Sequence, residues 1–462
     1  MTTAPDTAAI DRFLADHLCD WLDCRQDWLW YSILAVSEAL REGHSCLNLD
    51  YWAGTTAWAT DEDPGYRFPE LADWLGKLES LPITPDDPTP LVLDQQRLYL
   101  RRYWRFETEL AEAIRTRLEP VTMSAPDTAR DSLARLFPAT QEGTATDWQA
   151  VAAANALFQK LSVIAGGPGT GKTFTVTRLL ALLAETGAAG ADNSLRIRMA
   201  APTGKAAQRL GESVREARQA LTDKVSPETL ALIPDEATTL HRLLGVIPHQ
   251  VQFRHNRDNP LALDVLLVDE VSMIDLPMMT RLFRALPDHA RVILLGDPDQ
   301  LPSVAAGSVL ADLALRPHPG YSTPRQKQLA ELGLSVDASS HQPADYLSTL
   351  YLSRRFSDTG GIGRLARQVM DGDADGSLET LKANGEGLAW IEPEQVPAQI
   401  EHWVTQWYAP IARAENREDA FAALAEFRLL CPTRVGPRGS VALSEQILKR
   451  LNPEGRPFFR GQ

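Results

Sequence analysis

The chain has 462 residues, 44% of them hydrophobic and 23% charged, a composition typical of an ordinary soluble globular protein. Because a single hydrophobic core stops growing at roughly 250–300 residues, we expect two or three domains. No apolar run approaches the ~18 residues of a membrane span and the N-terminus lacks a signal-peptide pattern, which excludes a membrane protein and predicts a cytoplasmic one. Four cysteines without a CxxC pair exclude a disulfide framework and a zinc site, so we expect reduced thiols.

The formal net charge of −15 comes mostly from the first third of the chain. Residues 1–160 contain 14 Lys and Arg against 26 Asp and Glu, and they also contain eight of the eleven tryptophans. Such acidity disfavours DNA binding there and suggests a separate domain with a separate role. Apolar residues recur at helical spacing, with one hairpin pattern over 90–104, so we predict a mainly helical N-terminal domain over 1–138. The helical stretches are 10–42, 69–82 and 106–118.

From Trp148 onward, short apolar runs alternate with helical stretches. Strands that are apolar throughout and separated by helices indicate a parallel sheet covered on both faces. We therefore predict an α/β domain over 139–325 and a connector over 317–348, where Pro, Gly, Ser and Gln are mixed. Helical stretches over 361–383 and 396–426 then precede a strand-like segment. The predicted strands are 161–167, 195–202, 264–270 and 291–297, with the strand-like segment at 427–433.

A phosphate-binding pattern comes directly after the first of these strands. The segment GGPGTGKT over 166–173 matches the P-loop pattern in its strand–loop–helix context. The glycines let backbone N–H groups turn toward phosphate, Lys172 reaches the β- and γ-phosphates, and the Thr173 hydroxyl ligates Mg²⁺. The predicted nucleotide-binding residues are Gly166, Gly167, Pro168, Gly169, Thr170, Gly171, Lys172 and Thr173.

Two later strands end in polar residues. Asp269 ends the run VLLVD, where a P-loop enzyme needs a carboxylate for its metal ion, and the adjacent Glu270 can act as base for the attacking water. The next strand is followed by Gln300, for which two interpretations stay open: a sensor of the γ-phosphate or part of a capped loop.

Six motifs occur in the order found in superfamily 1 helicases, and together they resemble most closely the RecD family, the alpha subunit of exodeoxyribonuclease V (RecBCD). The resemblance implies a RecA-like P-loop NTPase domain that binds ATP and Mg²⁺, a helical N-terminal domain and a second RecA-like lobe. The Thr-x-His-Lys-x-Gln-Gly and Thr-Arg-Ala strings expected of that lobe are missing, so we expect 326–462 to be its truncated start. The motifs span 166–173, 200–210, 238–245, 266–279, 294–304 and 352–356.

The resemblance also implies roles at the nucleotide. Gln149 stands where these helicases read adenine, although a solvated helix residue is the alternative. Arg355 matches the arginine that reaches the γ-phosphate from the second lobe, and its neighbour Arg354 complicates the assignment. Arg434 or Arg438 could contact nucleotide or DNA.

Three further segments resemble the DNA-facing elements of the family. The motif that grips single-stranded DNA matches APTGKAA, and a second element matches TLHRLL. The insertion over about 246–262 occupies the place of a hairpin that meets the duplex junction, with a solvated loop as the alternative. The implied DNA-binding residues are Pro202, Thr203, Gly204, Lys205, His241 and Arg242, with Arg254, His255 and Arg257 in the insertion.

The function implied is an ATP-driven DNA helicase or translocase subunit, moving 5′ to 3′, in a RecBCD-type complex for double-strand break repair and recombination. Its partners would be single-stranded or duplex-end DNA and the other subunits, docked through the N-terminal domain. We expect the chain alone to hydrolyse ATP poorly because one wall of the site is partial. Alternatives are a stand-alone superfamily 1 helicase and a non-catalytic ATP-dependent binding module. No nuclease-like carboxylate cluster occurs, so nuclease activity would belong to a partner.

Overall fold

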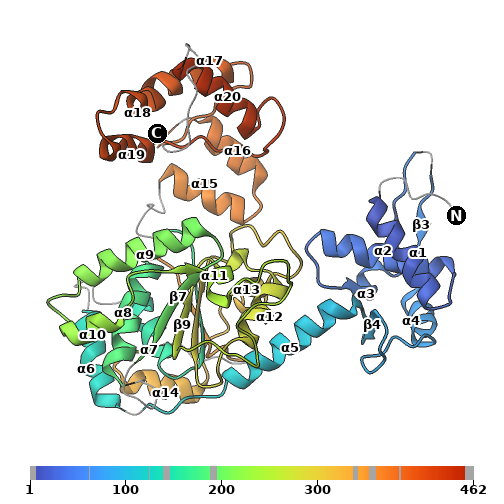
Figure 1. Cartoon of the computed structure of the whole chain (residues 1–462), viewed down its shortest axis with the longest axis horizontal. Coiled ribbons are helices and arrows are strands. Elements are labelled where there is room, and N and C mark those ends of the chain that lie inside the picture. Colours follow the sequence, from blue (N-terminus) through green and yellow to red (C-terminus); the bar gives the residue numbers. More distant parts are fainter. Residues whose placement is uncertain are drawn as a thin grey trace. The chain divides into compact units, whose positions relative to one another are not determined.

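The computed structural model divides the chain into two compact units, Met1–Ser357 and Asp358–Gln462. Each is described separately, and Figure 1 shows the elements of both. The structure describes residues 7–61, 63–123, 125–138, 146–187, 195–336, 342–352, 360–383, 385 and 387–452.

The N-terminal part of the first unit packs helices against a small antiparallel sheet of order β1-β5-β4. Trp74 is fully buried at its centre, where the indole Nε1 donates to Ser32 Oγ at 2.9 Å. The predicted hairpin is confirmed, because β4 and β5 pair across a turn at Gln95. The elements are α1 (Ala9–Trp21), α2 (Asp27–Arg41), β1 (Leu47–Asn48), α3 (Leu49–Trp52), β2 (Thr56–Ala57), β3 (Tyr66–Arg67), α4 (Leu71–Glu79), β4 (Leu91–Asp94) and β5 (Arg97–Leu100).

Helix α5 (Arg101–Arg117) joins this part to the larger α/β part. It starts directly after β5 and packs on α12 (Leu276–Arg284), where Thr280 Oγ1 donates to the Phe106 carbonyl oxygen at 3.0 Å. Phe106 and Leu110 belong to the apolar core under the large sheet. The N-terminal core therefore ends near Leu100, whereas our predicted domain extends to residue 138.

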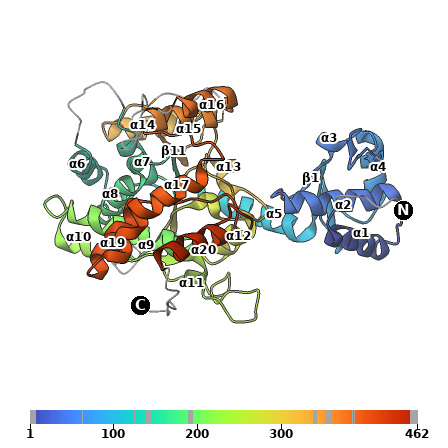
Figure 2. The same cartoon turned by 90° about the horizontal axis from the view of Figure 1, so that it is seen from above.

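A six-stranded parallel sheet of order β11-β6-β10-β9-β7-β8 forms the centre of the α/β part, as predicted for this fold class. Alternate residues of β6 serve two separate cores: Leu161 and Val163 face one, and Ile164 faces the other. Both faces are thus covered by helices, which explains why the strands are apolar throughout (Figures 1 and 2). The strands are β6 (Leu161–Gly166), β7 (Ile197–Ala201), β8 (Thr238–Thr239), β9 (Val265–Val268), β10 (Arg291–Gly296) and β11 (Leu347–Leu350).

The predicted connector over 317–348 contributes to this first sheet. β11 pairs with β6, and the buried Arg325 of the helix before it donates to the Asn155 carbonyl oxygen at 3.1 Å. The structure therefore groups residues up to 357 with the first unit, although we predicted a domain boundary at 325/326. The helices are α6 (Pro126–Leu136), α7 (Trp148–Ala156), α8 (Lys172–Glu185), α9 (Gly204–Gln219), α10 (Pro227–Leu232), α11 (Leu240–Leu244), η1 (Val271–Met273), α13 (Val309–Leu313) and α14 (Thr323–Glu331).

The described part of the second unit is helical. The helical stretches predicted over 361–383 and 396–426 are confirmed, but the strand predicted over 427–433 is wrong: this segment has no ladder partner among the described residues. An apolar run becomes a strand only where another strand pairs with it, and the described residues of this unit contain none. The elements are α15 (Gly361–Met370), α16 (Ala374–Lys382), α17 (Val396–Trp403), η2 (Val404–Tyr408), α18 (Ala409–Arg413), α19 (Arg417–Glu426) and α20 (Ser440–Leu451).

Across the described residues, no helix combines the length and apolar character needed to cross a bilayer.

Candidate nucleotide and DNA site

The motif segments of the first unit converge on one edge of the parallel sheet. Parallel strands end at the same edge, and in open α/β sheets this carboxyl edge is where ligands bind. The segment 166–173 follows β6, 202–205 follows β7, and 240–242 follows β8, while Asp269 follows β9 and Gln300 follows β10. Topology therefore gathers segments that lie far apart in the sequence.

The P-loop has the expected strand–loop–helix form. β6 ends at Gly166 and α8 begins at Lys172, whose ammonium Nζ donates to the carbonyl oxygens of Gly166 at 2.5 Å and Gly167 at 3.1 Å. Gly171 has φ +83°, and a Cβ there would lie 2.3 Å from Gln149 Nε2. The left-handed backbone favours glycine at this position, and a Cβ there would displace the end of the Gln149 side chain.

Gln149 lies against the P-loop, although it precedes Thr170 by 21 residues along the chain. Asp147 caps α7 by accepting from the Gln149 N–H at 3.0 Å, which fixes the start of the helix. The Gln149 side chain then donates through Nε2 to the Thr170 carbonyl oxygen at 2.9 Å, and the residue is 8% exposed. Tyr351, directly after β11, contacts Trp148 with ring centroids 5.1 Å apart. The chain thus leaves β11 beside the start of α7.

The two acidic residues after β9 occupy an unusual environment. Burial raises the pKa of Asp269 to about 6, opposed by the hydrogen bond from the Glu270 N–H and by the positive charge of Lys172. Glu270 has φ +54°, a conformation uncommon for a residue with a side chain and concentrated at functional sites. Burial makes the ionised form of Asp269 unfavourable, while the positive charge of Lys172 stabilises it. Such a carboxylate suits a position next to a bound cation.

Gln300 is exposed in the loop after β10, where its N–H donates to the Asp297 carbonyl oxygen at 3.2 Å. Asp297 is buried, and its Oδ1 accepts from the Asp299 N–H at 3.0 Å. β10 lies between β6 and β9 in the sheet, so this loop follows the strand flanked by those of the P-loop and Asp269. Arg354 and Arg355 lie outside the described residues.

The predicted DNA-facing residues lie at the starts of two neighbouring helices. Thr203 caps α9 by accepting from the Ala206 N–H at 3.2 Å, and Gly204 and Lys205 are exposed in its first turn. Thr239 caps α11 in the same way, by accepting from the Arg242 N–H at 3.2 Å, and His241 and Arg242 are exposed. β7 and β8 pair, so the structure brings the two motifs together. Pro202 is the partly buried residue before the first cap.

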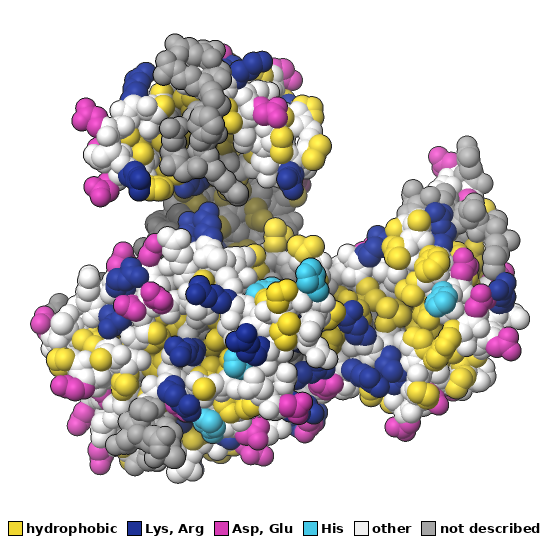
Figure 3. Space-filling view, viewed as in Figure 1, with side chains coloured by type: hydrophobic (Ala, Val, Ile, Leu, Met, Phe, Trp, Pro, Cys, Tyr) yellow, Lys and Arg dark blue, Asp and Glu magenta, His cyan; other side chains and the backbone are white. Residues whose placement is uncertain are grey.

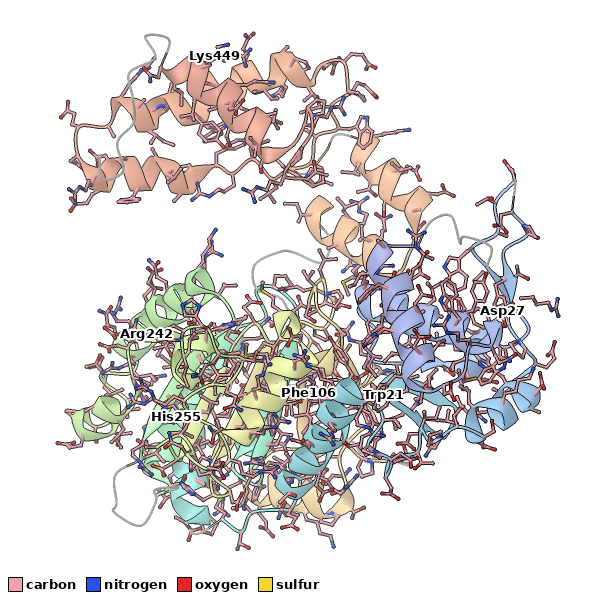
Figure 4. All side chains as sticks on the ribbon, turned by 45° about the vertical axis from the view of Figure 1, so that its right-hand side comes forward. Trp21, Asp27, Phe106, Arg242, His255 and Lys449 are labelled. Carbon is pink, nitrogen blue, oxygen red and sulfur yellow. The ribbon has the colours of Figure 1, made fainter. Side chains whose placement is uncertain are left out.

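The insertion over 246–262 folds back on α11. Val246 and Phe253 form an isolated antiparallel bridge, and the N–H groups of Arg254 and His255 donate to the carbonyl oxygens of Gly245 and Leu244 at 2.9 Å. Figure 4 labels His255 on this loop and Arg242 on α11. The insertion is an irregular hairpin-like loop rather than a pair of regular strands. Arg434 and Arg438 lie in the exposed loop before α20 of the second unit.

One group of residues was missed in the sequence. A cavity of about 520 Å³ lies between α5, the insertion and α12, and four arginines line it. The string RRYWRF over 101–106, in which basic and aromatic residues alternate, was the available signal. We interpreted residues 101–104 as the end of a hairpin, because two short apolar runs flank residues 94–96. The arginines of α12 lie about 175 residues further along the chain.

The comparisons with known proteins agree with this geometry. Residues 7–99 match the family model described as "RecBCD enzyme subunit RecD, N-terminal domain", and residues 149–306 match the one described as "AAA domain". The ATP-dependent RecD2 DNA helicase of Deinococcus radiodurans is 38% identical over 251 residues, which cover 53% of this chain and 30% of that protein.

Two relatives named RecBCD enzyme subunit RecD match almost the whole chain. The protein of Mycolicibacterium smegmatis is 38% identical over 431 residues, covering 92% of this chain and 69% of the relative. That of Mycobacterium tuberculosis is 36% identical over 462 residues, covering 98% of this chain and 73% of the relative. Nearly the whole chain aligns with these relatives, and it covers more than two thirds of each of them. The chain therefore belongs to the RecD family.

Proposed function

We propose that this chain is an ATP-hydrolysing DNA helicase subunit of a RecBCD-type complex that acts in the cytoplasm on broken DNA ends in repair and recombination, translocating 5′ to 3′. The main observation behind this proposal is that the predicted nucleotide-binding and DNA-binding motifs lie at the carboxyl edge of one parallel sheet in a chain of the RecD family. The resemblance of the motifs supplies the direction of movement.

The nucleotide site uses the P-loop and the β9 carboxylates. Lys172 neutralises the β- and γ-phosphates, and Gln149 contacts adenine while it braces the loop at Thr170. The Thr173 hydroxyl and the Asp269 carboxylate are the hard oxygen donors that Mg²⁺ prefers, and the ion would offset charge on the phosphates.

Chemistry and sensing fall to residues around the γ-phosphate. Glu270 accepts a proton from the attacking water, and Gln300 hydrogen-bonds the γ-phosphate from the loop after β10. By resemblance, Arg355 stabilises the charge of the transition state. The backbone of Gly166, Gly167, Pro168, Gly169, Thr170 and Gly171 surrounds the phosphates.

DNA lies across the starts of α9 and α11. Backbone N–H groups at Gly204, the charge of Lys205 and the guanidinium of Arg242 suit phosphate contacts, and His241 adds an imidazole beside them. Thr203 positions this group through its cap, with Pro202 before it. Figure 3 shows Lys and Arg side chains across this unit.

Partner subunits dock on the N-terminal part, through the exposed face of α1. Ile10, Phe13 and Trp21 lie on one helical face and are 61%, 67% and 53% exposed, and His17 stacks on Phe13. Exposed apolar side chains grouped in this way mark interaction sites. Figure 3 shows hydrophobic side chains at the surface of this part, and Figure 4 labels Trp21.

The test is DNA-stimulated ATP hydrolysis by the Lys172→Gln variant, with Lys160→Gln as matched control. The two lysines flank β6, and only Lys172 stands on the P-loop side. We expect Lys172→Gln to lower the rate at least ~100-fold, as loss of a transition-state charge contact does, and Lys160→Gln to leave it unchanged. Equal rates in both variants would contradict the P-loop assignment. Unwinding of 5′-tailed but not 3′-tailed duplexes by the assembled complex tests the direction.

A further inference from the structure

The cavity of about 520 Å³ lies outside the P-loop, none of whose residues line it. Its four arginines outnumber its two acidic residues, Glu109 and Asp258, so its lining is positively charged. Arg102 comes from α5, Arg257 from the insertion, and Arg281 and Arg284 from α12. Within the described part of the chain, only Glu109 forms an ion pair with any of them, with Arg284 at 2.7 Å. Among the same residues, Arg102, Arg257 and Arg281 have no ion-pair partner.

The arginines surround two aromatic rings. Phe106 of α5 is buried and has Arg102, Arg281 and Arg284 within 5.4–5.9 Å of its ring centroid. Arg281 also lies 5.7 Å from the ring centroid of Phe253 on the insertion. Cation–π contacts of this kind leave the N–H groups of Arg102 and Arg281 available to an anion.

Arg281 is poised for such an anion. It is partly buried, and burial, together with the charges of Arg102 and Arg284, lowers its pKa, opposed by the charge of Asp275. A phosphate oxygen would stabilise the charged guanidinium, which binds phosphate with two parallel hydrogen bonds.

The cavity continues the predicted DNA surface. His241 of α11 packs edge-on against Phe253, with ring centroids 5.9 Å apart, and Phe253 in turn packs against Arg281. Side-chain contacts thus run without interruption from α11, through the insertion, to α5. Figure 4 labels His255 and Phe106, both of which line the cavity.

We propose that this cavity is a second DNA-contact site, which holds one backbone phosphate of a single strand between Arg102 and Arg281 as the strand leaves α11. The inference rests on the proposed DNA-binding function and extends its path to α5. The volume lies in the range of sites for small ligands, and the continuity with α11 favours a nucleic acid strand over an acidic protein segment. Phe253 provides a ring beside the phosphate on which a base can stack.

The experiment measures binding of fluorescein-labelled (dT)₂₀ to the full 462-residue chain by anisotropy at several NaCl concentrations. The variants are Arg102→Gln and Arg281→Gln. The matched control is Arg115→Gln, an exposed arginine of the same helix α5 outside the cavity. We expect each cavity variant to bind five- to tenfold more weakly and to reduce the slope of log K against log [NaCl] by about 0.7, the value of one single-strand phosphate contact.

Arg102 is exposed on α5, so its replacement leaves the fold intact even if Arg281→Gln disturbs packing. An affinity and a salt slope in Arg102→Gln equal to those of the wild type would overturn the proposal. It would also be overturned if the cavity variants lost binding to the partner subunits but kept binding to DNA, because the cavity would then be a protein-binding site. If the wild-type chain itself does not bind (dT)₂₀, the proposed function fails together with the cavity. If the wild-type chain binds and the cavity variants match it, the cavity alone is excluded.

Discussion

Replacement of Asp269 by asparagine should stabilise the protein while it removes activity. The pKa of this carboxyl is raised from 3.8 to about 6, mainly by burial. A group whose pKa is higher in the folded state contributes stability below its unfolded pKa and loses it as the pH rises through the folded value. With each pKa unit worth ~1.36 kcal/mol, the ionised carboxylate costs about 3 kcal/mol above pH 6.

The assay is urea unfolding, without Mg²⁺ or nucleotide, of wild type and Asp269→Asn at pH 4.5 and pH 8. The asparagine oxygen still accepts from the Glu270 N–H, so we expect the variant to be more stable by up to about 3 kcal/mol at pH 8, with a far smaller difference at pH 4.5. ATP hydrolysis should be lost, since the proposed metal ligand is gone. A difference that does not change with pH, or lower stability at pH 8, would refute the reasoning.

Asp264, at the other end of β9, is the matched control. Hydrogen bonds from Arg196 lower the pKa of this carboxyl to about 2, so its contribution has the opposite sign: it is present above pH 3.8 and is lost as the pH falls through 2. Asp264→Asn should therefore destabilise the protein at pH 8, by up to about 2 kcal/mol. The same substitution at the two ends of one strand should thus shift stability in opposite directions.

Three further outcomes are expected from the structure. Gly171→Ala should lower both the unfolding midpoint and ATP affinity, measured by thermal melts and nucleotide titration, because its Cβ would clash with Gln149 Nε2; an unchanged affinity would contradict the packing described. Thr280→Val should cost about 1 kcal/mol in urea unfolding by removing the hydrogen bond to Phe106, and a neutral result would mean that this contact does not hold α5. Replacing Phe13 and Trp21 together by serine should abolish co-purification with the partner subunits, whereas the similarly exposed Tyr51→Ser should not; retained binding in the double variant would exclude the α1 face.

The sequence predicted those features whose pattern is local. The P-loop is one continuous strand–loop–helix segment, so Lys172 and Thr173 could be placed from spacing alone. The contact of Gln149 with Thr170 could be expected only by resemblance, because nothing in a helix start indicates which loop it will meet.

The missed features depend on distant partners. β11 is a four-residue run containing Ser348 and Thr349, and it becomes a strand because β6, about 180 residues earlier, offers it an edge. The apolar run over 427–433 has stronger strand character and forms no ladder in the described part of its unit. The cavity arginines on α5 and α12 likewise come together only when the two helices pack.

The direct passage from β5 into α5 makes the helix itself the connector between the N-terminal part and the α/β part of the first unit. No residue separates Leu100 from Arg101, so there is no flexible linker to absorb a change in length. Each residue inserted into an α-helix lengthens it by ~1.5 Å and rotates the chain beyond the insertion by ~100° about the helix axis. One residue inserted near the start of α5 would rotate the α1 face by ~100° about the helix axis. Four inserted residues would return the face to within ~40° of its original direction and move it ~6 Å along the axis. Relatives that keep the same docking orientation should therefore vary the length of α5 in whole turns.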